Sequence, residues 1–321
     1  MRAAVLHTAG SPPSYAEHPA PSGTPWSTLV RVTAAPVVPL DLLCASGTSY
    51  FGVPTTPYVP GGQGVGVVAA SESYAVGARV WFYTPAGMRP ADGSLAELCL
   101  VPDADVVPLE ASVPDELAAA LGLSGVAAWM ALSWRARLQP GERVLVLGGG
   151  GAVGQAGIGA ARALGASTVV AVARPASVER AEAAGADVVV PLGTTDVDDL
   201  AASLTPHGPY DVVLDPVFGT SATAAARELA AGGRLVHLGG ASGDTAVFSS
   251  AGLRSRSAAI LGYTNNALTG EQRAAALTAV LGHAAAGRIR MAYDVHPLTD
   301  VAAVWTGQVA GSHGRCVLVP R

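Results

Sequence analysis

Apolar residues in this chain gather in short runs that turn residues separate. Before residue 120 the runs are four or five residues long, and clusters of proline and glycine stand between them. Runs of this length with such punctuation are typical of β-strands. The clearest are Ala3–Leu6, Thr28–Val32, Gly64–Val68 and Val80–Tyr83. The first third of the chain is therefore predicted to be a β-rich domain of barrel or folded-sheet type.

The pattern changes at Asp115, where a stretch of helical composition runs to Arg135. From Arg143 onward apolar runs alternate with helical stretches, which predicts a doubly wound parallel sheet. A longer helix over Thr269–Ala286 and a final strand over Val317–Val319 follow. The predicted strands of the parallel sheet are Val144–Leu147, Thr168–Ala173, Asp187–Val190, Asp211–Leu214, Arg234–Leu238 and Ala258–Leu261, and the clearest helices between them are Ala152–Leu164 and Ser221–Ala231.

A glycine-rich turn joins the first of these parallel strands to its helix. Gly149, Gly151 and Gly154 fit G-x-G-x-x-G with a strand before and a helix after, which is the context that the pattern requires. The first glycine allows the tight turn, the second lets the backbone approach a pyrophosphate, and the third allows close packing of helix and strand. The helix N-terminus, at Ala152 and Val153, then presents free N–H groups to phosphates. The segment predicts a dinucleotide site.

The end of the second parallel strand indicates which dinucleotide to expect. An NAD site needs an acidic residue there to bind the ribose 2′-hydroxyl, but this chain ends the strand at Ala173 and continues with Arg174. A guanidinium can pair with a 2′-phosphate instead. We therefore expect NADPH, with Arg174 on its 2′-phosphate and Ser177 and Arg180 assisting. The alternative is that Arg174 is a solvated surface side chain.

Composition narrows the classes of function. The chain has 321 residues, half of them hydrophobic, which suffices for two domains whose cores need no disulfides. A net charge of −5 argues against a nucleic-acid or anionic-membrane partner. All 19 basic residues are arginine, which excludes Schiff-base and lysine general-base chemistry. The three cysteines are scattered and form no zinc motif.

Two further stretches bear on location. The apolar stretch between Glu116 and Arg135 approaches transmembrane length, but it is alanine-rich and is expected to be a buried helix rather than a membrane span. The first ten residues have no apolar core of a signal peptide. A cytoplasmic protein is therefore expected.

Nine segments spread along the whole chain carry a recognisable family pattern. They read PLDLLCASG (Pro39–Gly47), TPYVPGGQGVGVV (Thr56–Val68), GARVW (Gly77–Trp81), GSLAEL (Gly93–Leu98), AAWMAL (Ala127–Leu132), QPGERVLVLGGGGAVG (Gln139–Gly154), YDVVLDPVFG (Tyr210–Gly219), GGRLVHLGG (Gly232–Gly240) and HGRCVLV (His313–Val319). Together they resemble the zinc-independent medium-chain dehydrogenase/reductases of the quinone oxidoreductase branch.

The resemblance implies a particular domain organisation. A GroES-like catalytic domain, made from residues 1–122 and 264–321, would surround an NADP-binding Rossmann domain at residues 123–263, with the active site in the cleft between them. The resemblance also implies a small-molecule quinone or carbonyl substrate. Dimerisation through the sheet edge of the cofactor domain is common in the family, so a homodimer is the assembly to test.

The chain departs from its metal-dependent relatives at all three positions of their catalytic zinc ligands. Those relatives carry a cysteine, a Gly-His-Glu and a second cysteine where this chain has Val38, Gly61-Gly62-Gln63 and Leu123. None of these side chains is a usual zinc ligand, so a metal-free protein is expected. Quinone oxidoreductase relatives often carry asparagine at the Val38 position and threonine at the Ala127 position. Their loss leaves two alternatives, a reshaped site or a protein that holds cofactor without using it.

A metal-free site must polarise a carbonyl with a hydroxyl, an amide or a backbone N–H. Tyr50 and Tyr58 lie in the segment that lines the substrate cleft in this family, so they are the catalytic candidates, with a packed or surface tyrosine as the alternative for each. Asn265 follows the last strand at its carboxyl end, where ligands bind in open α/β sheets, although loop capping explains it equally well. The other cofactor candidates are Gly239, Gly240 and Arg315.

Four further polar residues are expected to be structural. Gln63 replaces an acid, and His237 is a lone histidine within a strand. Asp41 and Asp215 belong to family motifs and are interpreted as local hydrogen-bond anchors rather than bases.

The function expected from these observations is an NADPH-dependent, metal-free reductase that acts on a quinone or an α,β-unsaturated carbonyl, with a ketone reductase as a near variant. The alternative is an NADPH-binding sensor or partner-binding protein without turnover. The polarity of the site discriminates between them.

Overall fold

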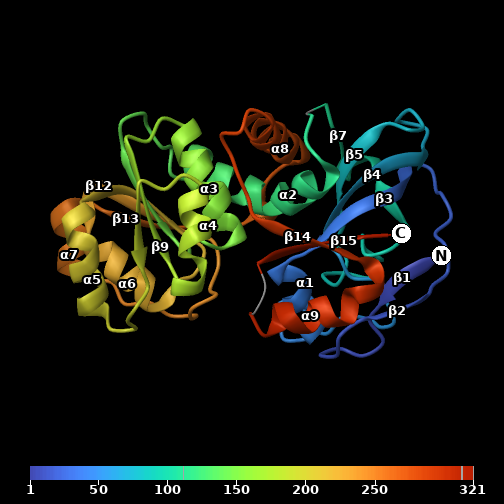
Figure 1. The fold of residues 1–321 in the computed structure, drawn as a ribbon, viewed down its shortest axis with the longest axis horizontal. Helices are drawn as coiled ribbons and strands as arrows, with labels where there is room; N and C mark the ends of the chain where they lie inside the picture. The colour runs from blue at the N-terminus through green and yellow to red at the C-terminus, as the bar shows by residue number, and fades with distance from the viewer. Residues whose placement is uncertain (111, 312–313, 321) are drawn as a thin grey trace. The chain divides into compact units, whose positions relative to one another are not determined.

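The computed structural model describes residues 1–110, 112–311 and 314–320, and it divides the chain into two compact units (Figure 1). The first unit comprises Met1–Gly122 and Ala292–Arg321, and the second comprises Leu123–Met291. His313, the first residue of the last family segment, lies outside the described residues. Residues 264–291, which the family resemblance places in the catalytic domain, instead belong to the second unit.

Packing explains this difference in the domain boundary. Helix α8 (Gly270–Ala285) buries Leu277 and Val280 within the second unit, and its His283 ring lies 5.1 Å from the ring of Trp129. A Cβ at Gly159 would lie 2.9 Å from the carbonyl oxygen of Arg288, so the backbone after α8 contacts the glycine loop's own helix closely. The periodicity of a helix shows that it has an apolar face but not which unit covers that face.

The second unit is built around a six-stranded parallel sheet in the order β10-β9-β8-β11-β12-β13. This is the Rossmann arrangement, in which the strand order reverses beside the first strand. Helices cover both faces of the sheet, so most strand residues are apolar and do not alternate with polar ones. They are β8 (Arg143–Leu147), β9 (Thr168–Ala173), β10 (Val188–Pro191), β11 (Tyr210–Asp215), β12 (Leu229–His237) and β13 (Ala259–Gly262). The predicted fold class is confirmed.

Helices follow these strands on the two faces of the sheet. They are α3 (Ala152–Ala163), α4 (Val178–Ala183), α5 (Val197–Leu204), α6 (Gly219–Arg227) and α7 (Ser250–Arg256). The predicted helix Ser221–Ala231 is wrong at its end, because β12 begins at Leu229. Leu229 is buried and pairs with Tyr210 of β11, and this tertiary pairing overrides the helical composition of an alanine-rich stretch.

The long apolar helix α2 (Asp115–Met130) continues as a π-helical turn over Ala131–Arg135. Its backbone is not helical at Gly122, where φ is 21° and ψ is −125°, so the chain bends as it passes into the second unit. In length and composition Asp115–Arg135 could cross a membrane, but 72% of its most apolar window is buried within the structure. Burial of that extent is typical of a core helix.

The first unit is mainly antiparallel. Its large sheet has the order β14-β15-β3-β4-β5-β7, with β6 also paired to β3, and a separate hairpin joins β1 to β2. Strand β15 returns from the end of the chain to pair with β3, as the sequence predicts for Val317–Val319. The elements are β1 (Arg2–Val5), β2 (Ser14–Glu17), β3 (Ser27–Val37), α1 (Pro39–Ser46), β4 (Gln63–Ala70), β5 (Arg79–Tyr83), β6 (Leu98–Pro102), β7 (Val106–Pro108), β14 (Tyr293–Pro297), α9 (Val301–Val309) and β15 (Arg315–Val319).

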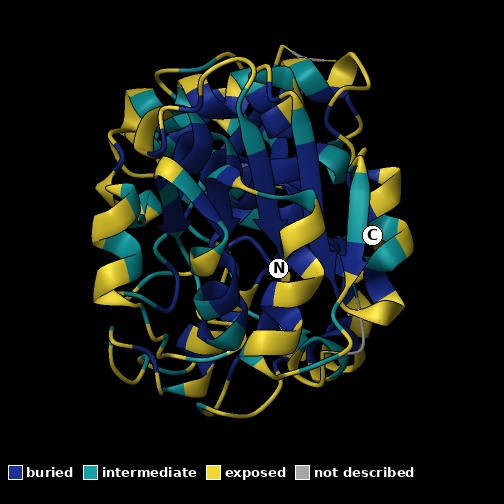
Figure 2. Cartoon of the chain, turned by 90° about the vertical axis from the view of Figure 1, so that its left-hand side faces the viewer, coloured by how far each residue is buried: buried dark blue, intermediate teal, exposed yellow. Residues whose placement is uncertain are grey.

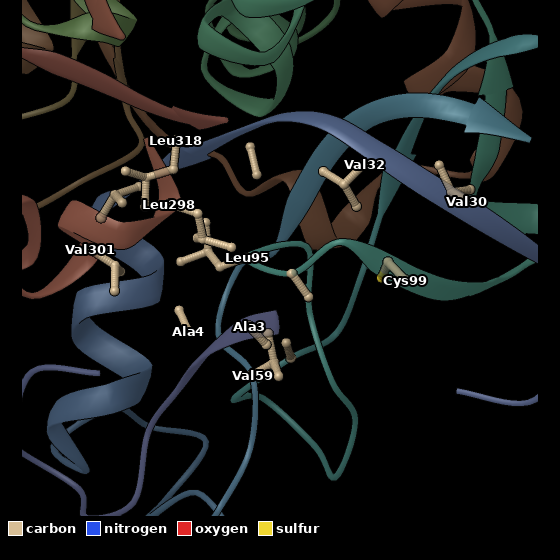
Figure 3. Close-up of a cluster of buried hydrophobic side chains, with 14 of the residues drawn as sticks. Ala3, Ala4, Val30, Val32, Val59, Leu95, Cys99, Leu298, Val301 and Leu318 are labelled. Atoms are coloured by element: carbon tan, nitrogen blue, oxygen red, sulfur yellow. The ribbon is translucent and has the colours of Figure 1, made fainter. Parts of the chain in front are cut away.

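The core of the first unit joins the two ends of the chain. Figure 3 shows Ala3 and Ala4 from the start of the chain near Leu298, Val301 and Leu318 from its end. All five are almost fully buried. Figure 2 shows how burial is distributed along the chain, with buried strands and with helices that carry exposed outer faces.

Candidate functional site

The glycine loop between β8 and α3 has the geometry that its sequence predicts. Gly149 donates its N–H to the carbonyl of Val172 at 2.8 Å, which fixes the turn to the neighbouring strand. A Cβ at Gly154 would lie 2.2 Å from the carbonyl oxygen of Gly148, so only glycine lets α3 approach the turn this closely. The first intrahelical bond of α3 is donated by Gln155 to Gly151. The N–H groups of Ala152, Val153 and Gly154 precede it and point out of the helix end, as an anion requires.

The loop contains a constraint that the motif does not reveal. Gly150, the first variable position of G-x-G-x-x-G, has no room for a side chain, because a Cβ there would lie 2.4 Å from the Cβ of Ser177. The carbonyl of Gly150 also accepts bonds from Gln155 Nε2 and from Arg180 Nε, both at 3.1 Å. The run of four glycines was the available signal. It indicates that the whole loop, and not only its three motif positions, is closely packed.

The carboxyl end of β9 presents arginine rather than an acid. Arg174 directly follows the strand and is exposed. Ser177 is buried and donates its hydroxyl to the carbonyl of Arg174 at 3.1 Å, so it holds the turn instead of facing solvent. Arg180 is half-buried against the glycine loop. Two guanidinium groups therefore accompany the loop, one exposed and one held on Gly150.

The turns after β11 and β12 lie against each other at the same end of the sheet. Asp215 is fully buried, and its Oδ1 accepts the N–H groups of Val217 at 3.0 Å and Phe218 at 2.8 Å. This carboxylate is the turn anchor that the sequence predicts. Burial raises the pKa of Asp215, and the two N–H bonds partly offset this rise. A Cβ at Gly239 would lie 2.9 Å from the carbonyl oxygen of Pro216, so Gly239 allows the close approach of the two turns.

His237 lies beside this anchor. Its Nδ1 is 3.5 Å from Asp215 Oδ2, and its ring stacks on Phe218 with centroids 3.9 Å apart. The histidine is thus held by a neighbouring carboxylate and an aromatic ring, as expected for a packed strand histidine. Gly240 continues the turn, and a Cβ there would lie 3.0 Å from the carbonyl oxygen of Gly243.

Asn265 uses both ends of its amide inside the second unit. Its Nδ2 donates to the carbonyl of Leu123 at 3.1 Å, and its Oδ1 accepts the hydroxyl of Tyr263 at 2.7 Å. Each end of the amide keeps one further hydrogen-bonding position, because its NH2 group has two N–H donors and its oxygen has two lone pairs. The two bonds fit the loop-capping alternative and are equally compatible with a contact to a ligand.

In the first unit, Asp41 and Arg315 are buried together. The carboxylate of Asp41 accepts the N–H of Val38 and the N–H of Gly62, both at 2.9 Å. Burial raises the pKa of Asp41 to about 6, and the two N–H bonds partly offset this rise. Arg315 donates Nη1 to the carbonyl of Val37 at 2.9 Å, and burial lowers its pKa to about 10. Asp41 is thus the local anchor that the sequence predicts, whereas Arg315, expected to reach the cofactor, is only 6% exposed.

Two of the three positions that the resemblance aligns with zinc ligands, Val38 and Gly61-Gly62-Gln63, make other contacts here. Val38 and Gly62 lie next to Asp41, and Gln63 is fully buried with its Oε1 accepting from Trp81 Nε1 at 3.1 Å. Gln63 is therefore structural, as predicted. Among the described residues, no group of three or more His, Cys, Asp or Glu side chains is placed to hold a metal ion.

The two candidate tyrosines have opposite environments. Tyr50 is 78% exposed, and its ring lies against Phe51 with centroids 4.2 Å apart. Tyr58 is only 5% exposed and lines a small cavity of about 100 Å³ together with Phe51 and Met88. Burial raises the pKa of Tyr58, so its hydroxyl keeps its proton. Both therefore remain candidates for a hydrogen-bond donor, one in an exposed turn and one in a pocket.

Comparison with known proteins identifies the fold's relatives. A family model described as an alcohol dehydrogenase GroES-like domain matches residues 24–111, and one described as a zinc-binding dehydrogenase matches residues 152–280. The solved quinone oxidoreductase of Thermus thermophilus is 30% identical with a TM-score of 0.79, and the match covers 99% of this chain and 100% of that chain. The chain belongs to the medium-chain dehydrogenase/reductase family. The family and the GroES-like and Rossmann folds expected from the sequence are confirmed.

Two curated relatives show the range of this family. Quinone oxidoreductase of Mus musculus is 34% identical over 141 residues, which is 43% of this chain and 41% of that protein. A phenolphthiocerol/phthiocerol polyketide synthase of Mycobacterium tuberculosis is 33% identical over 214 residues, which is 65% of this chain and 9% of that protein. The matched region is thus less than half the length of either relative.

Proposed function

We propose that this member of the family is an NADPH-dependent, metal-free reductase of a quinone or an α,β-unsaturated carbonyl, with a ketone as the nearest variant substrate. The observation that carries the proposal is the combination of the open N–H groups at Ala152–Gly154 with the exposed Arg174 at the end of β9. A cytoplasmic location and a homodimer belong to the same proposal.

The residues around the glycine loop fit NADPH. The pyrophosphate would accept from the free N–H groups at the start of α3, where the helix dipole favours negative charge. Arg174 would pair with the 2′-phosphate, since no carboxylate stands there to repel it or to bind a 2′-hydroxyl. Arg180, held on Gly150, adds positive charge beside it. The structure of the Thermus thermophilus relative in complex with NADPH supports this choice.

When bound, the nicotinamide supplies the hydride. The chain's part is to orient the two reactants, exclude water and donate a hydrogen bond to the substrate oxygen as it gains negative charge. Tyr50 and Tyr58 are the proposed donors. Tyr58 lines a small cavity, whereas Tyr50 has the access that a substrate needs. The residue types at Val38, Gly62 and Leu123 exclude the usual zinc ligands from the corresponding positions.

The apolar residues Val38 and Ala127 favour a second candidate function. Quinone oxidoreductase relatives often carry asparagine and threonine at these two positions, so two polar groups expected near the nicotinamide ribose are missing here. A protein that binds NADPH without turnover, as a sensor or as a partner-binding subunit, would need no donor to a substrate.

The oxidation of NADPH with a panel of quinones, enones and ketones tests the proposal. Turnover of a quinone or enone is expected. If Tyr58 is the donor, turnover should persist in Tyr50→Phe and fall in Tyr58→Phe, and if Tyr50 is the donor, the reverse should hold. Loss of a central donor lowers turnover by roughly 10²- to 10³-fold with little change in KM. Binding of NADPH without turnover of any substrate would favour the second function. About one zinc per purified chain in elemental analysis would overturn the metal-free assignment.

A further inference from the structure

We propose that the second unit has an additional binding site, for a small anionic molecule with an apolar body, in a cavity between α6 and α7. This α6–α7 cavity has a volume of about 610 Å³. It is lined by residues of α6, of α7, of the loop 245–249 before α7, and by Val197 at the start of α5. All of these elements belong to the second unit.

The α6–α7 cavity is separate from the dinucleotide site. With the strand order of this sheet, right-handed crossovers place α3 and α4 on one face and α5, α6 and α7 on the other. Figure 1 shows α5, α6 and α7 gathered together in the second unit, away from α3 and α4. The residues that line the cavity include none of the glycine loop and none of the segment 174–180. Its ligand is therefore not the NADPH of the proposed function.

The walls of the cavity define an amphipathic ligand. Apolar surface comes from Val197, Ala226, Leu253 and the loop segment 246–248, which contains Phe248. The charged residues that line the cavity are two arginines, Arg227 and Arg256, and no acidic side chain of the described residues lines it. A hydrophobic wall with two guanidinium groups at one side matches a carboxylate that carries an alkyl or aryl body.

Both guanidinium groups have N–H donors to offer. Arg256 donates Nη1 to the carbonyl of Arg227 at 2.6 Å, which positions it at the cavity and uses one of its nitrogens. Arg227 pairs with Asp198, but the two side chains are 48% and 83% exposed. An exposed ion pair contributes little to stability, so a ligand carboxylate can compete for the guanidinium. A guanidinium carries five N–H donors, so each arginine retains others for a ligand.

The size of the cavity also argues for an organic ligand. Small-molecule sites commonly have volumes of about 300–1,000 Å³, and this cavity falls within that range. A bare inorganic anion would leave the apolar wall hydrated, and an uncharged hydrocarbon would leave the arginines without an anion. The site thus requires charge and apolar area in one molecule.

Titration calorimetry of the full chain with octanoate, 1-octanol and acetate tests the site. Octanoate should bind at least about tenfold more tightly than either other compound, because acetate lacks the apolar body and octanol lacks the charge. The affinity for octanoate should be the same with and without NADPH. Absence of octanoate binding at millimolar concentration, equal affinity for octanol, or competition with NADPH would each overturn the proposal.

Two variants and a matched control locate the binding. Arg256→Gln should weaken octanoate binding by about tenfold, and Ala226→Leu should weaken it by filling the cavity. Arg254→Gln is the control, because Arg254 is an exposed arginine of the same helix that does not line the cavity. If Arg256→Gln and Arg254→Gln weaken octanoate binding equally, the proposed site is wrong. If Arg256→Gln lowers the melting temperature, Ala226→Leu decides the question alone.

Discussion

Two sets of polar groups, one in each unit, differ in whether their hydrogen-bonding capacity is already used within the protein. Around the glycine loop of the second unit, the polar groups are backbone N–H groups left open at Ala152–Gly154 and the exposed guanidinium of Arg174. In the first unit, Asp41 accepts two backbone N–H groups, and Arg315 is buried on a backbone carbonyl. The first set keeps N–H donors that it can offer to a ligand, whereas the second set already holds partners within the protein. The contrast teaches that a buried charge is not by itself a sign of a binding site.

The largest effect on NADPH binding is expected from a substitution in the glycine loop. Gly154→Ala would put a Cβ 2.2 Å from the carbonyl oxygen of Gly148 and push α3 away from the turn. NADPH binding should weaken by about 100-fold or more, because forced overpacking would displace the N–H groups proposed to bind the pyrophosphate. Gly282→Ala is the matched control, since it lies in α8 with no atom within 4 Å of the added Cβ. Titration of both variants with NADPH makes the comparison, and equal affinities would show that the close approach of α3 is unimportant.

A smaller effect is expected at Arg174. Arg174→Ala removes a charged contact worth about 1.5–3 kcal/mol, so the affinity for NADPH should fall by about 10- to 100-fold while that for NADH is nearly unchanged. Binding titrations with the two cofactors measure the difference. Equal losses for both would mean that Arg174 is a solvated arginine and that the 2′-phosphate is bound elsewhere.

The smallest expected effect is a change with pH in the stability that the buried Asp41 contributes. Burial raises the pKa of Asp41 from 3.8 to about 6, so the folded state holds this proton more tightly than the unfolded state. The contribution of Asp41 to stability is therefore fully present below about pH 3.8 and is lost as the pH rises through 6. Between pH 7 and pH 5 the free energy of unfolding of the wild type should gain about 1.4 kcal/mol relative to Asp41→Asn. Denaturant unfolding at the two pH values measures this gain, and a constant difference would show that Asp41 is ionised throughout.

Local pattern was enough to predict the fold but not all of the site. The glycine loop and the end of β9 belong to one strand-helix-strand unit, so Gly149, Gly151, Gly154 and Arg174 could be placed from local pattern alone. Arg315 and Asn265 could not, because their partners, Val37 and Leu123, are 278 and 142 residues away. The same reason explains the position of residues 264–291, whose apolar face had no visible partner in the sequence.

The central claim is that the N–H groups at the start of α3 hold the dinucleotide. Backbone amide NMR of the full chain during titration with NADPH tests it directly. The largest shifts are predicted at Ala152, Val153 and Gly154, with a shift at Arg174 for NADPH that NADH does not produce. Saturation with NADPH that leaves these three amides unshifted would contradict the account.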